Sequence, residues 1–220
     1  AQINIPVEKV WVDNNDQDGK RPESITVKLL ANGKDTNQFR ILNKGSDWKG
    51  TFTGLNQYQD GKEIVYTIEE VSVAGYETGI SGDAGTGYTI TNTHTPETIT
   101  ISGAKTWDDG DNQDGKRPES ITIRLYANGT ELRDKVLTVT EEDGWDWSFT
   151  NLPKYENGSQ INYTISEDAV TDYTTTVNGY DITNSYEPGK TSVSVTKSWQ
   201  DNNNQDGIRP ESITVKLLAN

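Results

Sequence analysis

Three segments of the chain carry a lysine where the alternation of a β-strand predicts an inward, apolar side chain. In the first of them Val7, Lys9 and Trp11 fall on one face, because successive side chains of a strand point to opposite sides of a sheet. The same phase recurs at Lys105 with Trp107 and at Lys197 with Trp199. Lysine is almost never fully buried without a compensating partner, so a fold that buries these positions has to supply one.

Two further patterns place polar partners at the apolar phase of other strands. The pattern Tyr-x-Ile-x-Glu ends on Glu70 and again on Glu167. The pattern Tyr-x-Ile-x-Asn ends on Asn92 and again on Asn184. Each of two complete copies therefore offers one Lys, one Glu and one Asn to a common interior, whereas the copy that contains Lys197 has neither the Glu nor the Asn.

Composition narrows the classes of protein and of partner. The 220 residues are 31% hydrophobic, which is enough for small cores but not for one large core. An excess of 34 acidic over 20 basic residues gives a net charge of −14, which repels nucleic acid and anionic membranes, so we expect neither as a partner. The chain has no cysteine, no apolar run long enough to span a membrane and no initiating methionine, and we expect an excised piece of a longer secreted protein.

A long internal repeat divides the sequence. The three tryptophans Trp11, Trp107 and Trp199 lie 96 and 92 residues apart, and each is followed eight positions later by the glycine of a shared Gln-Asp-Gly-x-Arg-Pro-Glu loop. A repeat of this length is a whole domain. We therefore predict domains at 1–95 and 96–189 and the incomplete start of a third at 190–220. Short joints that contain proline predict a semi-rigid array.

Within each copy the pattern is that of short strands and tight turns. Alternating β-branched and apolar residues follow the shared loop, at Ile25, Val27 and Leu29 in the first copy. The dipeptides Asn32-Gly33 and Asn128-Gly129 then predict type I′ hairpins, in which both central residues have positive φ. No segment shows a helical period, so we predict an all-β fold.

Taken together, these motifs resemble the B-type repeat, or Cna B-type domain, of staphylococcal collagen adhesin and related Gram-positive surface proteins. The resemblance rests on the inward Lys beside a Trp, the Asp-Gly-x-Arg-Pro loop, a Phe-x-x-Leu-x-x-Tyr segment, the Tyr-x-Ile-x-Glu strand and a terminal Ile-Thr-Asn. It covers nearly the whole chain, as two complete copies and the start of a third. Together the motifs are specific, although each alone is weak.

The resemblance implies tandem β-sandwich domains with inverse immunoglobulin-like, or prealbumin-like, topology, each holding a self-made Lys–Asn isopeptide bond. Carried over by position, Lys9 joins Asn92 beside Glu70, Lys105 joins Asn184 beside Glu167, and Lys197 stays unpaired. Family members serve as stalks that project a ligand-binding head from the bacterial cell wall. The expected setting is therefore extracellular, with neighbouring domains of the same protein as partners and host matrix reached through a separate head.

The residue types are suited to this chemistry. Burial disfavours charged forms, so it lowers the pKa of a lysine amine and raises that of a carboxyl group in general. A neutral amine can attack a carboxamide while a glutamate relays protons to the departing ammonia. Good orientation in a packed core is worth about 7–11 kcal/mol. The reaction consumes its own groups, so we expect single-turnover maturation and no enzyme with turnover.

Two alternatives use the same residues differently. The Lys, Glu and Asn can form a buried ion pair with hydrogen bonds and no covalent bond. The chain can also be a ligand-binding adhesin domain that contacts host matrix, which requires an exposed apolar or aromatic patch. We expect a monomer in either case.

Other candidate sites are weaker. Asp13, Asn15, Asp16 and Asp18 resemble an oxygen-rich calcium loop but lack the spacing and the bidentate Glu of an EF-hand, so a solvated, turn-forming loop is predicted. His94 is the only histidine, which excludes a multi-histidine metal site within one chain. We expect no metal and no cofactor, and we interpret the tryptophans as core anchors.

Overall fold

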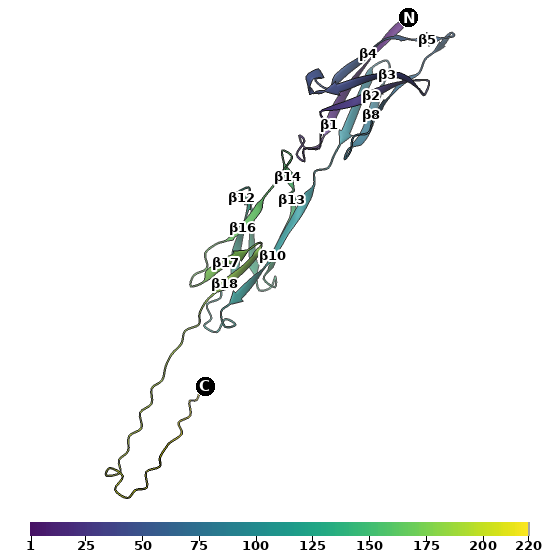
Figure 1. The fold of residues 1–220 in the computed structure, drawn as a ribbon. Coiled ribbons are helices and arrows are strands. Elements are labelled where there is room, and N and C mark those ends of the chain that lie inside the picture. Colours follow the sequence, from purple (N-terminus) through teal and green to yellow (C-terminus); the bar gives the residue numbers. More distant parts are fainter. Residues whose placement is uncertain (220) are drawn as a thin grey trace. The chain divides into compact units, whose positions relative to one another are not determined.

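The computed structural model describes residues 1–219, and nearly all of its regular structure is β-strand (Figure 1). A single 3₁₀ turn lies at Lys44–Ser46. The predicted all-β class is confirmed. The chain divides into two units, Ala1–Glu187 and a C-terminal unit that begins at Pro188.

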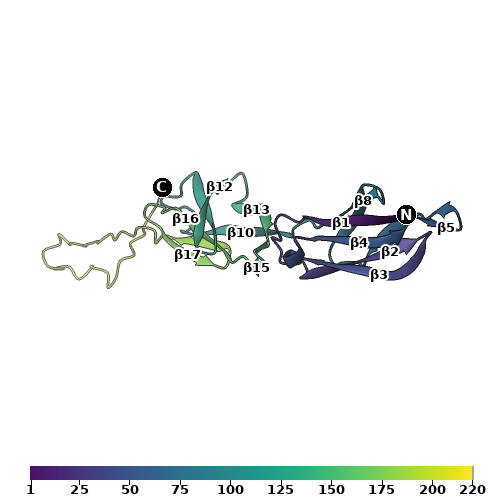
Figure 2. The same cartoon turned by 90° about the horizontal axis from the view of Figure 1, so that it is seen from above.

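Residues 1–95, the first repeat, form two sheets and a small hairpin. The four-stranded sheet has the order β4-β1-β9-β8, the three-stranded sheet β3-β2-β7, and the hairpin β5-β6. The strands are β1 (Gln2–Val12), β2 (Ser24–Ala31), β3 (Lys34–Asn43), β4 (Lys49–Asn56), β5 (Tyr58–Gln59), β6 (Lys62–Glu63), β7 (Tyr66–Glu70), β8 (Glu77–Asp83) and β9 (Gly87–Thr93). Strand β1 is antiparallel to β4 and parallel to β9. In Figure 2, β1 of the four-stranded sheet lies above β3 of the three-stranded sheet.

Residues 98–185, the second repeat, reproduce this arrangement strand for strand. The sheets have the orders β13-β10-β18-β17 and β12-β11-β16, with the hairpin β14-β15. The strands are β10 (Thr98–Asp108), β11 (Ser120–Ala127), β12 (Thr130–Thr140), β13 (Asp146–Pro153), β14 (Tyr155–Glu156), β15 (Ser159–Gln160), β16 (Tyr163–Glu167), β17 (Thr174–Asn178) and β18 (Asp181–Ser185). The first and last long strands are again parallel neighbours.

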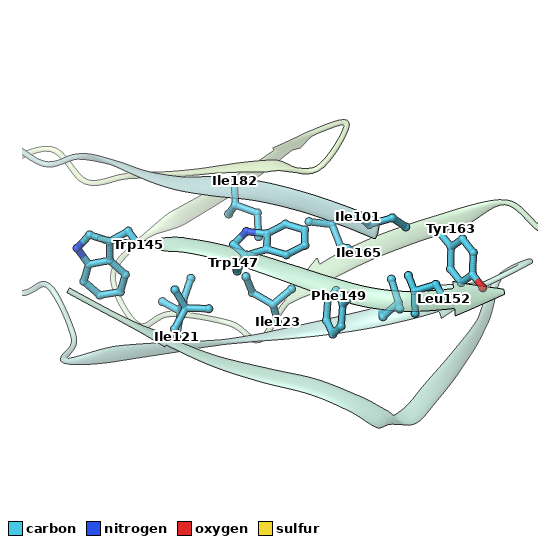
Figure 3. Close-up of a cluster of buried hydrophobic side chains, with 12 residues drawn as sticks. Ile101, Ile121, Ile123, Trp145, Trp147, Phe149, Leu152, Tyr163, Ile165 and Ile182 are labelled. Carbon is cyan, nitrogen blue, oxygen red and sulfur yellow. The ribbon is translucent and has the colours of Figure 1, made fainter. Parts of the chain in front are cut away.

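Each repeat has its own core between its two sheets. Inward side chains of both sheets interdigitate there, and outward ones remain polar or exposed, as the alternation predicts. Figure 3 shows this for the second repeat, where Ile123, Ile182 and Phe149 point into the same space between the strands. In the first repeat Phe52 and Ile90 are fully buried in the corresponding core. The core therefore lies against the inner face of β1, which carries Lys9.

The predicted asparagine-glycine turns are confirmed. Asn32 and Gly33 have φ values of 50° and 77°, and Asn128 and Gly129 have 48° and 81°. These turns join β2 to β3 and β11 to β12, and they pair Ala31 with Lys34 across the first hairpin. The left-handed conformation that glycine and asparagine tolerate thus sets the register of the three-stranded sheets.

The junction between β9 and β10 is held by polar contacts. Asp18 Oδ2 accepts hydrogen bonds from the backbone N–H of Glu97 at 2.8 Å and lies 2.9 Å from Nε2 of His94. The carboxylate of Glu97 also contacts the Nζ atoms of Lys154 at 2.8 Å and Lys20 at 3.0 Å. Hydrogen bonds from these two lysines lower the pKa of Glu97 to about 2. The contacts restrain the first joint, in agreement with its short length.

The described part of the C-terminal unit, residues 188–219, contains no strand. Its apolar residues are exposed, including Val193, Val195 and Trp199, the last with 38% of its surface accessible. The interpretation of Trp199 as a core anchor is therefore wrong. An isolated strand segment has no second apolar face to pack against, so it gains little from burial. Among residues 1–219 we find no helix that is long and apolar enough to cross a membrane.

Candidate cross-linking site

The structure brings Lys9, Glu70 and Asn92 together inside the first repeat. Lys9 on β1 and Asn92 on β9 point from neighbouring strands of one sheet, and Glu70 reaches them from β7 in the facing sheet. The side chains of Lys9 and Glu70 have no accessible surface, and Asn92 is fully buried. Nζ of Lys9 lies 3.2 Å from Oε1 of Glu70, and Nδ2 of Asn92 donates to the same oxygen at 3.2 Å. One carboxylate oxygen therefore faces both nitrogen atoms.

The parallel pairing of β1 and β9 explains why the lysine and the asparagine meet. Lys9 pairs with Ile90, and Trp11 pairs with Asn92. Asn92 is thus two residues beyond the partner of Lys9, on the same face of the sheet, where a long lysine side chain can reach it. The two side chains that the alternation predicts to point inward therefore lie close together in the core.

The second repeat contains the same set. Nζ of Lys105 lies 3.0 Å from Oε1 of Glu167, and both side chains have no accessible surface. Asn184 is fully buried and pairs with Trp107 across β10 and β18. The two sites differ in the amide: Asn92 donates to its glutamate, whereas neither the nitrogen nor the oxygen of the Asn184 amide has a hydrogen-bond partner among the described residues.

The environment of both lysines favours the neutral amine. Burial lowers the pKa of Lys9 below its ordinary value, and the negative charge of Glu70 offsets only part of that effect. Burial likewise lowers the pKa of Lys105, opposed by the hydrogen bond and charge of Glu167. A lowered pKa raises the fraction of amine that carries a free lone pair, which is the nucleophilic form.

Several polar atoms of the two sites are buried without hydrogen bonds. Within the described residues they are Oδ1 of Asn92 and both amide atoms of Asn184, whereas each lysine Nζ has a glutamate oxygen at 3.2 Å or 3.0 Å. Leaving a buried polar group unsatisfied costs about 1–3 kcal/mol. A fully satisfied ion-pair network does not leave the amide groups so poorly bonded. The arrangement is instead suited to a reaction that consumes the amine and the amide.

Aromatic rings cover the lysine in both repeats. Nζ of Lys9 lies 4.5 Å from the ring centroid of Trp11, which packs edge-on against Trp48 at 5.2 Å and Tyr76 at 5.0 Å. In the second repeat the corresponding distances are 4.3 Å for Lys105 to Trp107, 5.2 Å for Trp107 to Trp145 and 5.1 Å for Trp107 to Tyr173. These rings exclude water from the amine and keep the local dielectric low.

The sequence analysis missed a threonine beside each glutamate. Thr78 donates from Oγ1 to Oε2 of Glu70 at 2.6 Å, and Thr175 donates to Oε2 of Glu167 at 2.7 Å. The signal is present in the sequence, because each Thr follows its Glu by eight residues and ends a Tyr-x-Thr triplet. It was inconspicuous because β8 and β17 are exposed along their length and show no alternation of burial.

The acidic loop forms tight turns as predicted, but it is only partly solvated. Asp13 and Asp18 are buried, with 2% and 7% of their surface accessible. Arg21 binds Asp13 through two nitrogens, at 2.6 Å and 3.0 Å, and the hydroxyl of Tyr76 donates to the same carboxylate at 2.8 Å. Solvation was predicted wrongly for Asp13, because Arg21 of the same loop and Tyr76, 63 positions further along the chain, contact its carboxylate. In the second repeat the equivalent Arg117 holds the pKa of Asp109 at about 2.

These loops serve as structural clamps. Asp16 accepts the backbone N–H of Arg21 at 2.9 Å, which closes the turn, and Asn15 has the positive φ of a tight turn. Among residues 1–219 no group of three or more His, Cys, Asp or Glu side chains is arranged to hold a metal ion. Lys197 lies in the C-terminal unit, where its Nζ donates to the carbonyl of Ser198 at 2.9 Å and sits 4.1 Å from the ring centroid of Trp199.

Comparison with known proteins matches the chain to one family. The family model of the Cna protein B-type domain matches residues 5–93, 101–185 and 193–220. The chain is 51% identical over 218 residues to the collagen adhesin of Staphylococcus aureus. That alignment covers 99% of this chain and 18% of the adhesin, so the chain spans less than a fifth of that relative.

A solved structure shows the same fold. The crystal structure of two B repeat units of the collagen-binding protein Cna of Staphylococcus aureus is similar with a TM-score of 0.78 and 50% identity. The match covers 95% of this chain and 56% of that one. The resemblance found in the sequence motifs is thereby confirmed, as is the tandem β-sandwich architecture.

Proposed function

This chain belongs to the Cna protein B-type domain family, and from that premise we propose that it is part of a stalk whose complete repeats are each locked by an internal Lys–Asn amide bond. The observation that carries the proposal is the buried set of Lys9, Glu70 and Asn92, with one glutamate oxygen 3.2 Å from both nitrogens. The set recurs at Lys105, Glu167 and Asn184. Domains at 1–95 and 96–189, with a third beginning at 190, are part of the proposal.

The bond forms by attack, proton transfer and loss of ammonia, and the atoms balance over these steps. The neutral amine of Lys9 attacks the carboxamide carbon of Asn92, and a tetrahedral intermediate forms. Oε1 of Glu70 takes a proton from the attacking nitrogen and delivers a proton to the departing one, so the C–N bond of the carboxamide breaks and ammonia leaves. One amine and one primary amide thus become one secondary amide and one ammonia. Glu70 ends as it began, and the site has reacted once.

The bond would resolve the poor hydrogen bonding of the site. A secondary amide has one N–H and one carbonyl in place of an ammonium and a primary amide, so fewer buried donors remain to be satisfied. It also removes the cost of a buried charge on Lys9, which an ion pair retains. Both effects favour the covalent product over the non-covalent network.

The bond would make a repeat resist tension because it joins the first and the last strand of that repeat. Strand β1 opens the first repeat and β9 closes it, and the two are parallel neighbours. Tension that enters through β1 and leaves through β9 would pass through the amide between Lys9 and Asn92 rather than through the ladders of the sheets. A cross-link that closes a loop of roughly 100 residues also stabilises a fold by about 4–5 kcal/mol in the chain-entropy model.

The cellular setting is inferred from the relatives. Two of the matches are described as a collagen adhesin and as repeats of a collagen-binding protein of Staphylococcus aureus. We infer that the chain is extracellular, belongs to a surface protein of a Gram-positive cell wall, and has neighbouring domains of that protein as its main partners. Contact with host matrix would be made by another part of the protein.

The mass of the purified chain tests the proposal directly. Two amide bonds lower the mass by two ammonia molecules relative to the sequence. Protease digestion then identifies branched peptides that join Lys9 to Asn92 and Lys105 to Asn184. A mass equal to that of the sequence would overturn the covalent proposal and leave a buried ion pair in each repeat.

A further inference from the structure

Thr78 and Thr175 occupy equivalent places at the edge of the two sites. Thr78 lies on β8 directly across from Asn92 of β9, and Thr175 lies on β17 directly across from Asn184 of β18. Each hydroxyl donates to Oε2 of the glutamate in its repeat, at 2.6 Å and 2.7 Å. The threonine–glutamate contact uses the same atoms and the same register in both repeats, which indicates the same role in each.

The two carboxylate oxygens of Glu70 make different contacts. Oε1 of Glu70 faces the amine of Lys9 and the amide of Asn92, and Oε2 is held by Thr78. The terminal torsion of a glutamate is broad and rotates readily. A hydrogen bond to Oε2 restricts that rotation, so that Oε1 keeps facing both nitrogens.

The threonines also lie between the carboxylate and solvent. Thr78 and Thr175 are exposed residues, whereas the side chains of Glu70 and Glu167 have no accessible surface. The hydroxyl therefore takes the place that a water molecule would otherwise occupy at Oε2. Hydrogen bonds to a carboxylate are among the stronger ones in proteins, so this contact competes well with water.

We propose that Thr78 and Thr175 are positioning residues for amide formation, which hold Oε2 of the glutamate so that Oε1 carries the proton from the attacking to the leaving nitrogen. The inference rests on the proposed function, since it assumes that the bond forms. The threonines take no part in the exchange of protons, and the products are those already given. A misplacement of reacting groups by about 1 Å costs roughly 100-fold in rate, which sets the scale of the expected effect.

The test compares three variants of the second repeat, with the first repeat as an unaltered copy in the same molecule. Thr175→Val keeps the shape and removes the donor, and Thr175→Ser restores a hydroxyl. Thr176→Val is the matched control, because Thr176 is the next residue of β17 and points to the opposite face. The full chain is made in a short pulse of cell-free synthesis, and ammonia loss from each repeat is followed by mass spectrometry of digested samples.

We expect Thr175→Val to slow amide formation in the second repeat by about 10- to 100-fold while the first repeat reacts at the normal rate. Thr175→Ser and Thr176→Val should react like wild type. If Thr175→Val reacts at the normal rate and both bonds form in wild type, the positioning role of the threonine is wrong, whereas the proposed function is unaffected. Absence of both bonds in wild type would instead overturn the proposed function.

A second measurement separates positioning from a general effect on folding. In a Lys105→Ala background no bond can form in the second repeat. There, Thr175→Val should lower the midpoint of thermal unfolding no more than Thr176→Val does. A clearly larger decrease would assign the threonine to fold stability and would count against positioning.

Discussion

The backbone carbonyl of Trp48 accepts a hydrogen bond of 2.8 Å from the backbone N–H of Lys9. Trp48 has a φ of 58°, in the left-handed region that bulky residues rarely occupy. Trp145 repeats this, with a φ of 59° and a hydrogen bond of 2.8 Å from the N–H of Lys105. The contact lies just beyond the point where the pairing of β1 with β4 ends, at Glu8 and Lys49. It holds the backbone of Lys9 on the side where pairing with β4 has ended, while β9 continues to pair with β1 on the other side. Strained residues of this kind gather at functional sites.

Replacing this tryptophan should slow amide formation without removing the backbone contact. Trp48→Gly accepts the positive φ and keeps the carbonyl in place, but it removes the ring that packs on Trp11. We expect slower ammonia loss in the first repeat. The decrease in unfolding free energy should stay below the roughly 3–5 kcal/mol for removing a fully buried aromatic side chain, because Trp48 is only partly buried. Peptide mapping and denaturant unfolding measure the two effects. The second repeat, which keeps Trp145, should react as in wild type.

The glutamates should be required for the bonds but not for the fold. Glu70→Ala leaves the apolar alternation of β7 intact and removes the oxygen that faces both nitrogens. We expect a mass lowered by one ammonia instead of two, with a circular dichroism spectrum like that of wild type. Glu167→Ala should do the same in the second repeat, and the double variant should have the mass of the sequence. Two bonds in Glu70→Ala would show that the role assigned to Glu70 is wrong.

Loss of the first cross-link should make the first repeat extensible. In Lys9→Ala the force-bearing amide is absent, so the chain between β1 and β9 can extend when a single molecule is pulled. We expect one added unfolding event relative to wild type, and faster proteolysis because the loop-closure stabilisation of about 4–5 kcal/mol is gone. The matched variant Lys28→Ala removes a lysine from β2 in the facing sheet. The side chain of Lys28 is partly exposed and makes a 4.0 Å ion pair with Asp35. This variant should behave like wild type under force, and equal extension of all three proteins would contradict the prediction.

The first joint should weaken as pH rises. The hydrogen bond with Asp18 raises the pKa of His94 above its usual value of 6.5, with a smaller opposing effect of burial and of Lys20, and a supporting contact from the carbonyl of Gly75. Because the folded state favours the charged histidine, this stabilisation is fully present below the unfolded pKa and is lost as pH rises through the raised pKa. NMR titration of His94 should show the raised value, and Asp18→Asn should return it toward 6.5.

The second repeat suggests the control for this prediction. Tyr186 stands where the first repeat has His94, and its hydroxyl donates to Asp114 at 2.9 Å. In His94→Tyr the contact to Asp18 no longer depends on the charge of an imidazole. The midpoint of thermal unfolding should then vary less between pH 6 and pH 9 than in wild type, where it should decrease. If the unfolding midpoint depended on pH in the same way in both proteins, the charge of His94 would not contribute to the stability of the joint.

The convergence of Lys9, Glu70 and Asn92 could be predicted because each lies at the inward phase of its own strand, and a period of two leaves little choice of face. The burial of Asp13 could not, because its partners, Arg21 in the same loop and Tyr76 at 63 positions further along the chain, follow no local period. Thr78 escaped notice for a related reason, since it lies on an exposed edge strand and only its hydroxyl reaches the interior. The positive φ of Trp48 has no signal in residue type at all, because tryptophan is disfavoured there.

The parallel course of β1 and β9 determines how much each repeat adds to the length of a tandem array. A chain that enters a repeat along β1 and leaves it along β9 travels in the same direction both times, so it exits at the end opposite to its entrance. The 11 residues of β1 span about 36 Å at roughly 3.3 Å per residue. Each added repeat therefore contributes a fixed increment of reach. If the proposed amide closes each increment, the length of the array would be set by the number of repeats and would not change under tension.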